Sequence, residues 1–493
     1  MMVPQSGAHT TTGKVDKNAM QASSDYTGLA SDSRDVKPGY LFAALPGTKA
    51  DGASFVKDAV ARGAVAVLGL PEVEPAARAL GVKFIADENP RRGLARHAAR
   101  FFGVQPKTVA AITGTKGKSS IVAFVREIWT ALGKPAASLG TVGVVTPKGE
   151  IPLRHTTPDP IEIHRLLAQL KQNGIDHLAL EASSHGLDQF RLDGVEIAAC
   201  GFTNLSRDHF DYHKTVENYV RAKLRLFTEV VRNGGVAVVN ADAEYADRFI
   251  DAAKARHLTL LTVGEKGDAI RLLSREGRID GQTLKVRHKD RDFPINLPLA
   301  GSFQASNALV AAGLVIGLGD DPAKVFAALE HLKGAPGRLE RVAYAPTGAP
   351  VYVDYAHTPD SLEQVLTAVR PHVSGKLHVI FGCGGDRDKG KRPLMGEAAA
   401  KNADTVIVTD DNPRSEDAAT IRREALAGAP NAHEIGDRAA AIRAGIGALE
   451  MGDMLIIAGK GHETGQIVGS ETRPFSDRDE AVKAAKELGG RAA

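Results

Sequence analysis

Short runs of apolar residues recur along most of the chain, and each is followed by glycine or polar residues and then by a helical pattern. Four such runs lie in the middle of the sequence, at residues 109–112, 177–180, 197–202 and 236–239. Four more lie in the last third, at residues 351–354, 377–381, 405–409 and 454–457. A strand, a turn and a helix repeated in this order are typical of α/β domains with mainly parallel sheets. The pattern therefore predicts the α/β fold class, with ligands bound at the carboxyl ends of the strands.

The domain organisation follows from this pattern and from the length of 493 residues, which suggests roughly three domains. Residues 1–24 are polar and lack the apolar segment of a signal peptide, so we expect a disordered extension there. We expect a small domain at residues 25–90, a large central domain at 91–335 and a third domain at 336–493. The segment GAPGR, residues 334–338, has the composition of a linker before the third domain.

Composition restricts the classes of function. An apolar content of 43% and a charged content of 25% are those of a soluble globular protein. The net charge of +3 is too small to favour a nucleic-acid partner, and no apolar run of about 18 residues predicts a membrane span. Cys200 and Cys383 both follow apolar runs, which favours two buried thiols over a disulfide and suits a reducing cytoplasm.

The segment TVAAITGTKGKSS, residues 108–120, has the pattern of a phosphate-binding loop. Gly114 and Gly117 would let backbone N–H groups approach a polyphosphate, and the following helix adds its positive N-terminal end. In this interpretation Lys118 neutralises the β and γ oxygens, and Ser119 ligates Mg²⁺. The loop is a short form of the common P-loop, because Ile112 occupies its first glycine position. A purely structural turn is the alternative.

Two further polar groups follow apolar runs in the middle of the chain. Glu181 ends the run HLALE, where a carboxylate could hold Mg²⁺ opposite the phosphate loop or could simply be solvated. The segment TNLSRDHFDYH, residues 203–213, is rich in aspartate and histidine. It could hold a metal or form a solvated loop, and spacing alone does not decide.

Lys223 lies near the middle of an apolar helical stripe. At 100° per residue, Val216, Val220, Leu224 and Phe227 share its face, whereas Arg221 and Arg225 lie on the other face. Either Lys223 extends to solvent along this face, or it is desolvated and its pKa is lowered. A neutral amine can add CO₂ to form an anionic carbamate, which would place a negative group beside a metal site.

Three polar loops follow strands in the last third of the chain: residues 382–395 (GCGGDRDKGKRPLM), 410–414 (DDNPR) and 459–463 (GKGHE). Arg387 and Arg414 can bind carboxylates through two parallel hydrogen bonds, and Glu463 can bind an ammonium group. Together they predict a site for an amino acid with more than one carboxylate. Ordinary surface turns are the alternative.

Eight motifs in a fixed order resemble the Mur ligases, the cytoplasmic ATP-dependent ligases of muramyl peptides. They are TGTKGKSS, EASSHGL, TNLSRDHFDYH, GRLE, DYAHTP, GGDRDKGKRP, DNPR and GKGHE. The resemblance extends from about residue 31 to residue 480 and is strongest to the branch that adds meso-diaminopimelate. That branch joins it to the D-glutamate γ-carboxyl of UDP-N-acetylmuramoyl-L-alanyl-D-glutamate, in peptidoglycan precursor synthesis. The resemblance implies an acyl-phosphate intermediate, formed with ATP and two Mg²⁺ ions.

The resemblance also implies three α/β domains, namely a small N-terminal UDP-binding domain, a central P-loop ATPase and a C-terminal Rossmann-like domain. It implies UDP-substrate contacts for Ser33, Thr156, Thr157, Ser183, Gln189 and Arg191. It implies ATP contacts for Gly114, Thr115, Lys116, Gly117, Lys118, Ser119, Ser120, Asn307, Arg338 and Asp354. It implies meso-diaminopimelate contacts for Arg387, Asp411, Asn412, Pro413, Arg414, Gly459 and Glu463. It implies Mg²⁺ contacts for Ser119, Glu181, His209 and the carbamate of Lys223, with catalytic roles for Lys118, Lys223 and His209.

Several points stay open at this level. The group that deprotonates the incoming amine is not identified, and His209 and His357 are both candidates. Lys116 stands where close relatives often have asparagine, and Thr464-Gly465-Gln466 stands where Asp-Tyr-Gln is more usual. A related ligase, such as a folylpolyglutamate synthetase, is the nearest alternative function. A nucleotide-switched binding protein is a second, weakened because no guanine-reading N-K-x-D motif occurs. We expect a cytoplasmic monomer with small-molecule substrates.

Overall fold

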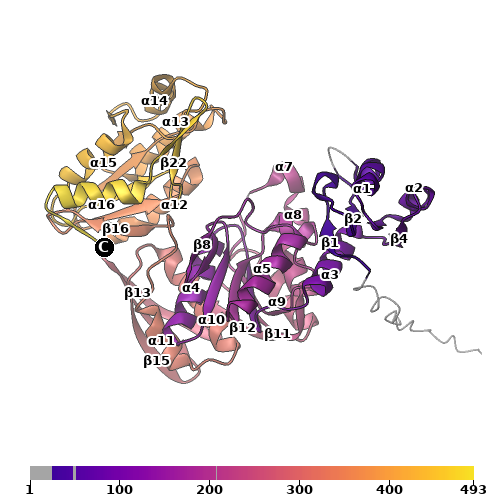
Figure 1. The fold of residues 1–493 in the computed structure, drawn as a ribbon. Coiled ribbons are helices and arrows are strands. Elements are labelled where there is room, and N and C mark those ends of the chain that lie inside the picture. The colour runs from indigo at the N-terminus through magenta and orange to yellow at the C-terminus, as the bar shows by residue number, and fades with distance from the viewer. Residues whose placement is uncertain (1–24, 48–50, 207) are drawn as a thin grey trace, which may run out of the picture. The chain divides into compact units, whose positions relative to one another are not determined.

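The computed structural model of the protein describes residues 25–47, 51–206 and 208–493. The extension expected at residues 1–24 lies outside the described residues. The chain divides into two compact units, one ending at Val104 and including Pro160–Arg165, the other formed by Gln105–Asp159 and Leu166–Ala493. Three large sheets with helices beside them confirm the predicted α/β class (Figure 1). Among the described residues, none of the helices combines the length and the apolar character that a membrane crossing requires.

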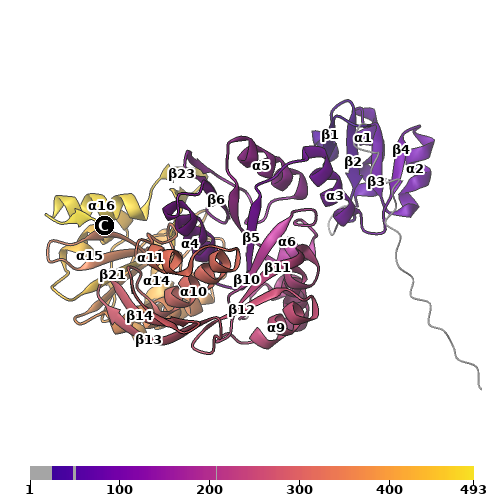
Figure 2. The ribbon, with the colours of Figure 1, turned by 90° about the horizontal axis from the view of Figure 1, so that it is seen from below.

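The first unit is a parallel sheet covered on both faces. Its strands follow sequence order: β1 (Gly28–Ala30), β2 (Tyr40–Ala44), β3 (Ala66–Gly69) and β4 (Lys83–Ala86). Alternate side chains of a strand point to opposite faces. Accordingly, Phe42 packs with α1 (Val56–Ala61) and α2 (Glu74–Ala79), whereas Leu41 packs with α3 (Pro90–Phe102). Figure 2 shows these three helices beside the four strands.

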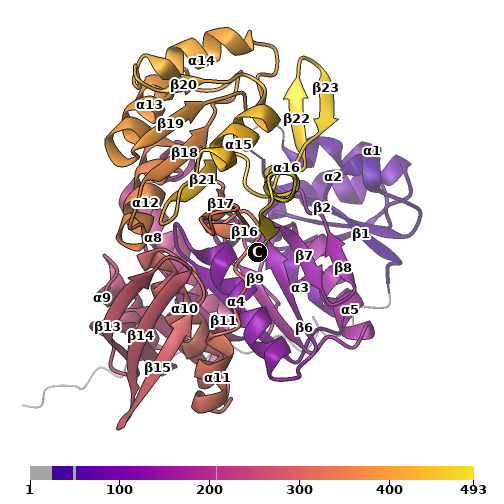
Figure 3. The same ribbon diagram turned by 90° about the vertical axis from the view of Figure 1, so that its left-hand side faces the viewer.

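The second unit contains an eleven-stranded sheet whose middle is parallel. This middle runs β6 (Ala136–Gly140), β9 (His177–Glu181), β5 (Thr108–Thr113), β10 (Ile197–Phe202), β11 (Val231–Asn240) and β12 (Thr259–Gly264). At one end the antiparallel strands β7 (Gly143–Thr146) and β8 (Gly149–Ile151) extend the sheet beyond β6. At the other end β13 (Ile270–Arg278) pairs parallel with β12, and β14 (Gly281–His288) and β15 (Arg291–Leu297) follow it in antiparallel order (Figure 3).

One large apolar core stabilises this sheet. It joins α4 (Lys118–Ala131), α10 (Ser302–Gly317) and α11 (Pro322–Leu329) to the strands, and it includes Phe124, Trp129 and Leu314. The hydrophobic pattern of α10 is continuous around the helix, which is the pattern of a helix buried on all sides. The remaining helices of this region are α6 (Ser184–Asp188), α7 (Phe210–His213), α8 (Val216–Arg225) and α9 (Ala246–Ala255), and α5 (Pro160–Gln172) belongs to the first unit as far as Arg165 and to the second unit from Leu166.

The second unit also contains a seven-stranded sheet. Its order is β20 (His433–Glu434), β19 (Thr405–Val408), β18 (Leu377–Phe381), β21 (Met454–Ala458), β17 (Pro350–Asp354), β16 (Glu340–Tyr344) and β24 (Arg491–Ala492). β20 to β17 are parallel, whereas β16 and β24 are antiparallel. One face packs against α12 (Pro359–Val369), α13 (Lys391–Asn402) and α14 (Ala418–Leu426), and the other against α15 (Arg438–Gly447) and α16 (Asp477–Glu487). A hairpin of β22 (Gly465–Val468) and β23 (Glu471–Pro474) follows β21.

All eight strands predicted from apolar runs are confirmed, although β11 begins at Val231 and not at residue 236 as predicted. Cys200 and Cys383 are buried free thiols, as predicted. The domain boundaries remain predictions.

Candidate nucleotide and amino-acid sites

The predicted phosphate loop has strand–turn–helix geometry. β5 ends at Thr113, and α4 begins at Lys118. Gly117 has φ +86°, and a Cβ placed on it would lie 2.4 Å from the Oδ1 atom of Asn307. A Cβ on Gly114 would lie 2.0 Å from the Oγ1 atom of Thr203. Both glycines are therefore required for the close approach of neighbouring chain segments.

The side chain of Lys118 is bound to its own loop. Its Nζ atom donates to the carbonyl oxygens of Gly114 at 3.0 Å and Thr115 at 2.9 Å. Burial lowers the pKa of this ammonium group. The loop is held in turn by the segment after β10, because the backbone N–H of Lys116 donates to Asn204 Oδ1 at 3.0 Å. Ser120, the last residue of the predicted loop, is buried in the first turn of α4.

Ser119 and Glu181 meet at the carboxyl edge of the central sheet. Ser119 Oγ donates to Glu181 Oε1 at 2.9 Å, and the backbone N–H of Thr141 donates to the same oxygen at 2.8 Å. Both side chains line a cavity together with Gly140 and Pro336. A hydroxyl and a carboxylate are oxygen donors of the kind that Mg²⁺ prefers, so this pair fits the predicted ion.

Lys223 is buried beside the phosphate loop, with 1% of the residue exposed. Its Nζ atom donates to Gly114 O at 2.6 Å and lies 4.5 Å from the ring centre of Tyr219. Burial, and then the charge of Lys118, lower the pKa of Lys223 well below its usual range. Of the two interpretations of this lysine, the desolvated one is therefore correct.

The helical-wheel placement around Lys223 is wrong at two positions. Arg225, expected on the polar face, is buried because its guanidinium contacts Asp193 at 3.1 Å and Glu229 at 3.0 Å. Val216, expected on the apolar face, is exposed at the first position of α8. A charged side chain can be buried where a carboxylate meets it, which periodicity alone cannot reveal.

His209 stands apart from Ser119 and Glu181, in that no contact joins it to either within the described residues. Its Nε2 atom lies 3.5 Å from Asp208 Oδ2, and its ring centre lies 4.9 Å from that of His185. The described residues contain no group of three or more histidine, cysteine, aspartate or glutamate side chains suited to a metal. The segment 203–213 therefore forms no such site by itself in the part of the chain described.

The UDP-substrate residues predicted in the second unit form one hydrogen-bonded group. Thr157 Oγ1 donates to Glu181 O at 2.8 Å, and the Ser183 N–H donates to Thr157 Oγ1 at 3.1 Å. Arg191 donates to Thr157 O at 2.6 Å and to Gln189 Oε1 at 2.7 Å. Thr156 Oγ1 lies 3.0 Å from Thr141 Oγ1. Ser33 is buried in the first unit, in a short 3₁₀ helix (Ser33–Asp35).

The other predicted ATP residues are packed and polar. Asn307 Nδ2 donates to Gln304 Oε1 at 3.0 Å, beside Gly117. The carboxylate of Asp354 accepts from the backbone N–H groups of Leu339 at 2.7 Å and Ala356 at 2.8 Å. Burial raises the pKa of Asp354. The Arg338 guanidinium lies 4.7 Å from the ring centre of Tyr355.

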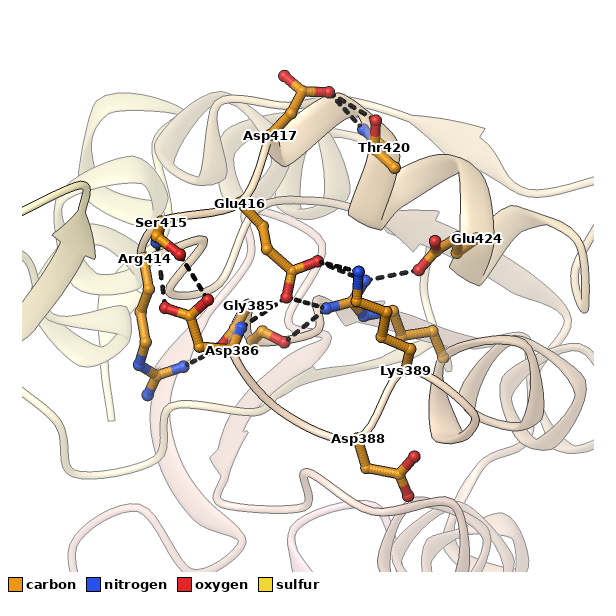
Figure 4. A network of polar contacts seen from close by, with 12 residues as sticks. Gly385, Asp386, Asp388, Lys389, Arg414, Ser415, Glu416, Asp417, Thr420 and Glu424 are labelled. Atoms are coloured by element: carbon orange, nitrogen blue, oxygen red, sulfur yellow. Dashed lines mark hydrogen bonds and ion pairs between the residues drawn. The ribbon is translucent and has the colours of Figure 1, made fainter.

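The predicted amino-acid residues gather where β18, β19 and β21 end. A Cβ placed on Gly384 would lie 2.8 Å from Arg414 Nη1 and 3.8 Å from Arg387 Cγ, so both arginines border this glycine. Arg414 Nη1 donates to Gly385 O at 2.8 Å (Figure 4). The Arg414 backbone N–H donates to Ile467 O at 3.0 Å, which ties the loop to β22.

A buried lysine that sequence reasoning missed organises the rest of this group. Lys460 is fully buried, and its Nζ atom donates to Asn412 Oδ1 and Glu463 Oε2, each at 3.1 Å. Asn412 Nδ2 donates to the same oxygen of Glu463 at 3.0 Å. The available signal was its place between Gly459 and Glu463, directly after a buried strand.

A buried ion pair lies behind these side chains. Arg438 contacts Asp477 through Nε and Nη2, both at 2.7 Å, and neither side chain is exposed. Asp411 lies next to them, and burial raises its pKa. A Cβ on Gly459 would lie 2.7 Å from Asp411 Oδ2, so the absence of a side chain at Gly459 leaves room for this carboxylate. Pro413 is also buried.

Comparison with known proteins matches three family models along the chain. They are the Mur ligase family catalytic domain at residues 25–102, the Mur ligase middle domain at 112–315 and the Mur ligase glutamate ligase domain at 337–461. A UDP-N-acetylmuramoyl-L-alanyl-D-glutamate–2,6-diaminopimelate ligase of Bradyrhizobium diazoefficiens is 58% identical over 470 residues. The match covers 94% of this chain and 95% of that protein. The ligase of the same name from Caulobacter vibrioides is 52% identical, with 93% and 95% covered.

Solved structures agree with these matches. A structure of a ligase with the same name is 35% identical, has a TM-score of 0.73 and covers 94% of this chain and 95% of its own. A Mycobacterium tuberculosis folylpolyglutamate synthase is 18% identical with a TM-score of 0.60, covering 81% of this chain and 94% of its own. At that identity the second likeness concerns the fold alone.

Proposed function

The chain belongs to the Mur ligase family, and on this premise we propose that it joins meso-diaminopimelate to UDP-N-acetylmuramoyl-L-alanyl-D-glutamate with consumption of ATP. The names of relatives that are 52–58% identical over nearly the whole chain support this substrate. The single observation that carries the amino-acid part is that Arg387 and Arg414 both border Gly384. The Arg414 guanidinium and the aliphatic stem of Arg387 meet at this glycine, so both arginines could reach a second carboxylate on the incoming amino acid.

The proposed reaction needs activation of a carboxylate, because oxide is a very poor leaving group. Transfer of the γ-phosphoryl group of ATP to the D-glutamate γ-carboxylate forms an acyl phosphate. The amine of diaminopimelate then attacks the acyl carbon, and the tetrahedral intermediate expels phosphate. ADP, phosphate and the amide are the products.

The described side chains can serve these steps. The Lys118 ammonium now bound to loop carbonyls can turn to phosphate oxygens and offset charge during transfer. The residues that would hold Mg²⁺ are Ser119, Glu181, the Lys223 carbamate and His209, which contacts neither Ser119 nor Glu181 in the described contacts. The bound ion would supply further neutralisation of phosphate charge. Glu463, held by Lys460 and Asn412, can orient an ammonium group of the amino acid. The base for the attacking amine stays open between His209 and His357.

Phosphate release tests this function directly. The purified protein receives ATP, Mg²⁺ and UDP-N-acetylmuramoyl-L-alanyl-D-glutamate, with meso-diaminopimelate or L-lysine as acceptor. We expect release that needs the acceptor and strongly prefers diaminopimelate. Release with lysine alone would keep a ligase and reject the assignment of Arg414, whereas ATP hydrolysis without an amide product would favour a nucleotide switch.

The variant Arg414→Ala tests, in the same assay, whether Arg414 is the residue that selects diaminopimelate over lysine (the selector). Without Arg414, one carboxylate of diaminopimelate lacks its buried charge partner. This loss corresponds to roughly 2–5 kcal/mol, so kcat/KM for diaminopimelate should fall about 30- to several-thousand-fold. The affinity for ATP should not change. Equal use of both amino acids by the wild-type protein would contradict the selector.

The carbamate on Lys223 is a separate part of the proposal. The lowered pKa leaves more of the amine neutral at a given pH, and only the neutral amine adds CO₂. We expect activity to fall in CO₂-depleted buffer and to return with bicarbonate, and ¹³C-bicarbonate to give a carbamate NMR signal that Lys223→Ala lacks. Full activity of Lys223→Ala would reject the carbamate.

We also propose that the protein is located in the cytoplasm and is a monomer.

A further inference from the structure

Glu416, two residues after Arg414, is surrounded by groups that bind negative charge. Its Oε1 atom accepts from Arg392 Nη2 at 2.9 Å and from the backbone N–H of Asp386 at 2.6 Å. Its Oε2 atom lies 3.1 Å from Arg392 Nη1 and 3.3 Å from Lys389 Nζ (Figure 4). Hydrogen bonding from Arg392 is the main cause that lowers the pKa of Glu416 to about 2. Four partners occupy the acceptor sites of this carboxylate, so it has little capacity left for a ligand.

Arg392 connects Glu416 to the glycine that the two arginines border. The Arg392 side chain is fully buried. Besides Glu416, its guanidinium contacts Glu424 Oε2 at 2.5 Å and donates to Gly384 O at 3.4 Å. A buried guanidinium keeps its place only where carboxylates meet it. Glu416 therefore fixes a cation that in turn contacts the backbone of Gly384.

A second bridge runs between the same two loops. Asp386 accepts from Ser415 Oγ at 2.6 Å and from the Ser415 backbone N–H at 3.2 Å. The Gly385 N–H donates to Asn412 O at 2.9 Å. Asp386 and Arg414 both have φ +53°, a left-handed conformation that non-glycine residues rarely adopt. These bridges hold the two strained residues in place.

We propose that Glu416 is a positioning residue, which locks the loop of residues 382–391 onto the loop of residues 410–416 and so holds Arg387 and Arg414 around Gly384. This inference rests on the proposed function, because the carboxylate that the two arginines bind is that of diaminopimelate. Glu416 does not touch the amino acid. It acts through Arg392 and the backbone of residues 384–386.

Glu416→Gln is the primary test. Glutamine keeps the shape but removes the negative charge and turns one acceptor into a donor that faces Arg392 or Lys389. We expect KM for meso-diaminopimelate to rise about 10- to 100-fold, as for the loss of hydrogen bonds to charged groups. KM for ATP and for the UDP-substrate should stay within about twofold of wild type.

Glu487→Gln is the matched control. It removes the charge from another glutamate–arginine pair, Glu487 with Arg443, on exposed surface of the same sheet region. We expect no change in any KM. If the control raises KM for diaminopimelate as much as Glu416→Gln, the effect is general to the region and the inference is rejected.

A double-mutant cycle separates positioning from stability. If Glu416 acts through the arginine pair, Glu416→Gln should add little to the loss already caused by Arg414→Ala. Fully additive losses would reject the positioning role. If Glu416→Gln does not fold, Lys389→Met replaces it in the cycle, because Lys389 is exposed and its ammonium group contacts Glu416 Oε2. A KM for diaminopimelate unchanged in Lys389→Met would then reject the role of Glu416.

The same measurements show whether the proposed function or only the role of Glu416 is wrong. Wild-type protein that releases no phosphate with diaminopimelate rejects the proposed function itself. Active wild-type protein with additive losses, or with an unchanged KM in Glu416→Gln, rejects only the role of Glu416.

Discussion

The phosphate loop and the amino-acid loops hold their cations in opposite ways. Lys118 and Lys223 both donate to the carbonyl oxygen of Gly114, and carboxylates do not contact either ammonium group in the described contacts. At the end of the seven-stranded sheet, Arg392, Arg438 and Lys460 are buried against carboxylates. The first arrangement leaves the Lys118 ammonium group ready to exchange its carbonyl partners for an anion, and leaves the Lys223 amine, whose pKa is lowered, ready to add CO₂. The second arrangement fixes the site before any ligand arrives.

This difference follows from what each region binds in the proposed reaction. Phosphate charge moves during transfer, so a lysine on a flexible stem with weak neutral partners can follow it. Recognition of a second carboxylate depends on geometry, so arginines held by a rigid framework serve it better. Mutations should therefore alter chemistry in the central region, and stability or amino-acid affinity in the other.

The largest expected effect comes from the buried ion pair. Asp477→Asn leaves the fully buried Arg438 without its charge partner, which should lower the free energy of unfolding by roughly 3–5 kcal/mol. Urea unfolding followed by circular dichroism should shift to lower concentration. The single tryptophan, Trp129, lies in the core of the central sheet and reports on that region separately.

Asp479→Asn, an exposed change on the same helix, is the control and should leave both signals unchanged. An early circular dichroism transition with little change in Trp129 fluorescence would show that the two regions unfold separately. An unchanged transition in Asp477→Asn would contradict the role given to the ion pair.

The second effect concerns chemistry. Lys118→Met removes the ammonium group of the phosphate loop, and kcat should fall about 10²- to 10³-fold, as when one stabilising donor is lost. The affinity for diaminopimelate, measured by calorimetry, should stay at the wild-type value because the framework of the other region is intact. Lys107→Met, at an exposed lysine before β5, is the control. A matching loss of diaminopimelate affinity in Lys118→Met would break the comparison between the regions.

The contrast also explains how far the sequence could predict the site. The phosphate loop is contiguous, so strand, glycine turn and helix could all be predicted from residues 108–120, and the structure has them there. The framework around Arg392 is not contiguous, because its partners Glu416 and Glu424 lie 24 and 32 residues further along the chain. In sequence Arg392 belongs to the charged run RDKGKR, which suggests solvent or an anionic ligand rather than burial.

Prediction of the fold from the sequence is limited in a similar way. Apolar runs predicted eight strands that have a parallel neighbour, because such strands are apolar on both faces. The buried parallel strand β6 was not among them. The antiparallel strands β13 to β15 were not predicted. In β14 the buried Leu284 and Val286 alternate with the exposed Lys285 and Arg287, and this alternation contains no continuous apolar run. A charged helix residue such as Arg225 was misplaced for a related reason, since its burial depends on Asp193 from a distant segment.

The smallest expected effect is the most specific one. Lys460→Met removes a buried charge but keeps an unbranched side chain of similar length. Its partner Glu463 is 36% exposed, so water can meet that carboxylate and the free energy of unfolding should change by no more than about 1 kcal/mol. Glu463 and Asn412 then lose the ammonium group that aligns them. KM for meso-diaminopimelate should rise by roughly tenfold, as for one lost hydrogen bond to a charged group, with kcat and KM for ATP unchanged. Lys401→Met, at an exposed lysine paired with Glu363 on the same sheet region, is the control. A large loss of stability without a change in KM would make Lys460 a structural residue, and the framework would then serve the fold rather than the ligand.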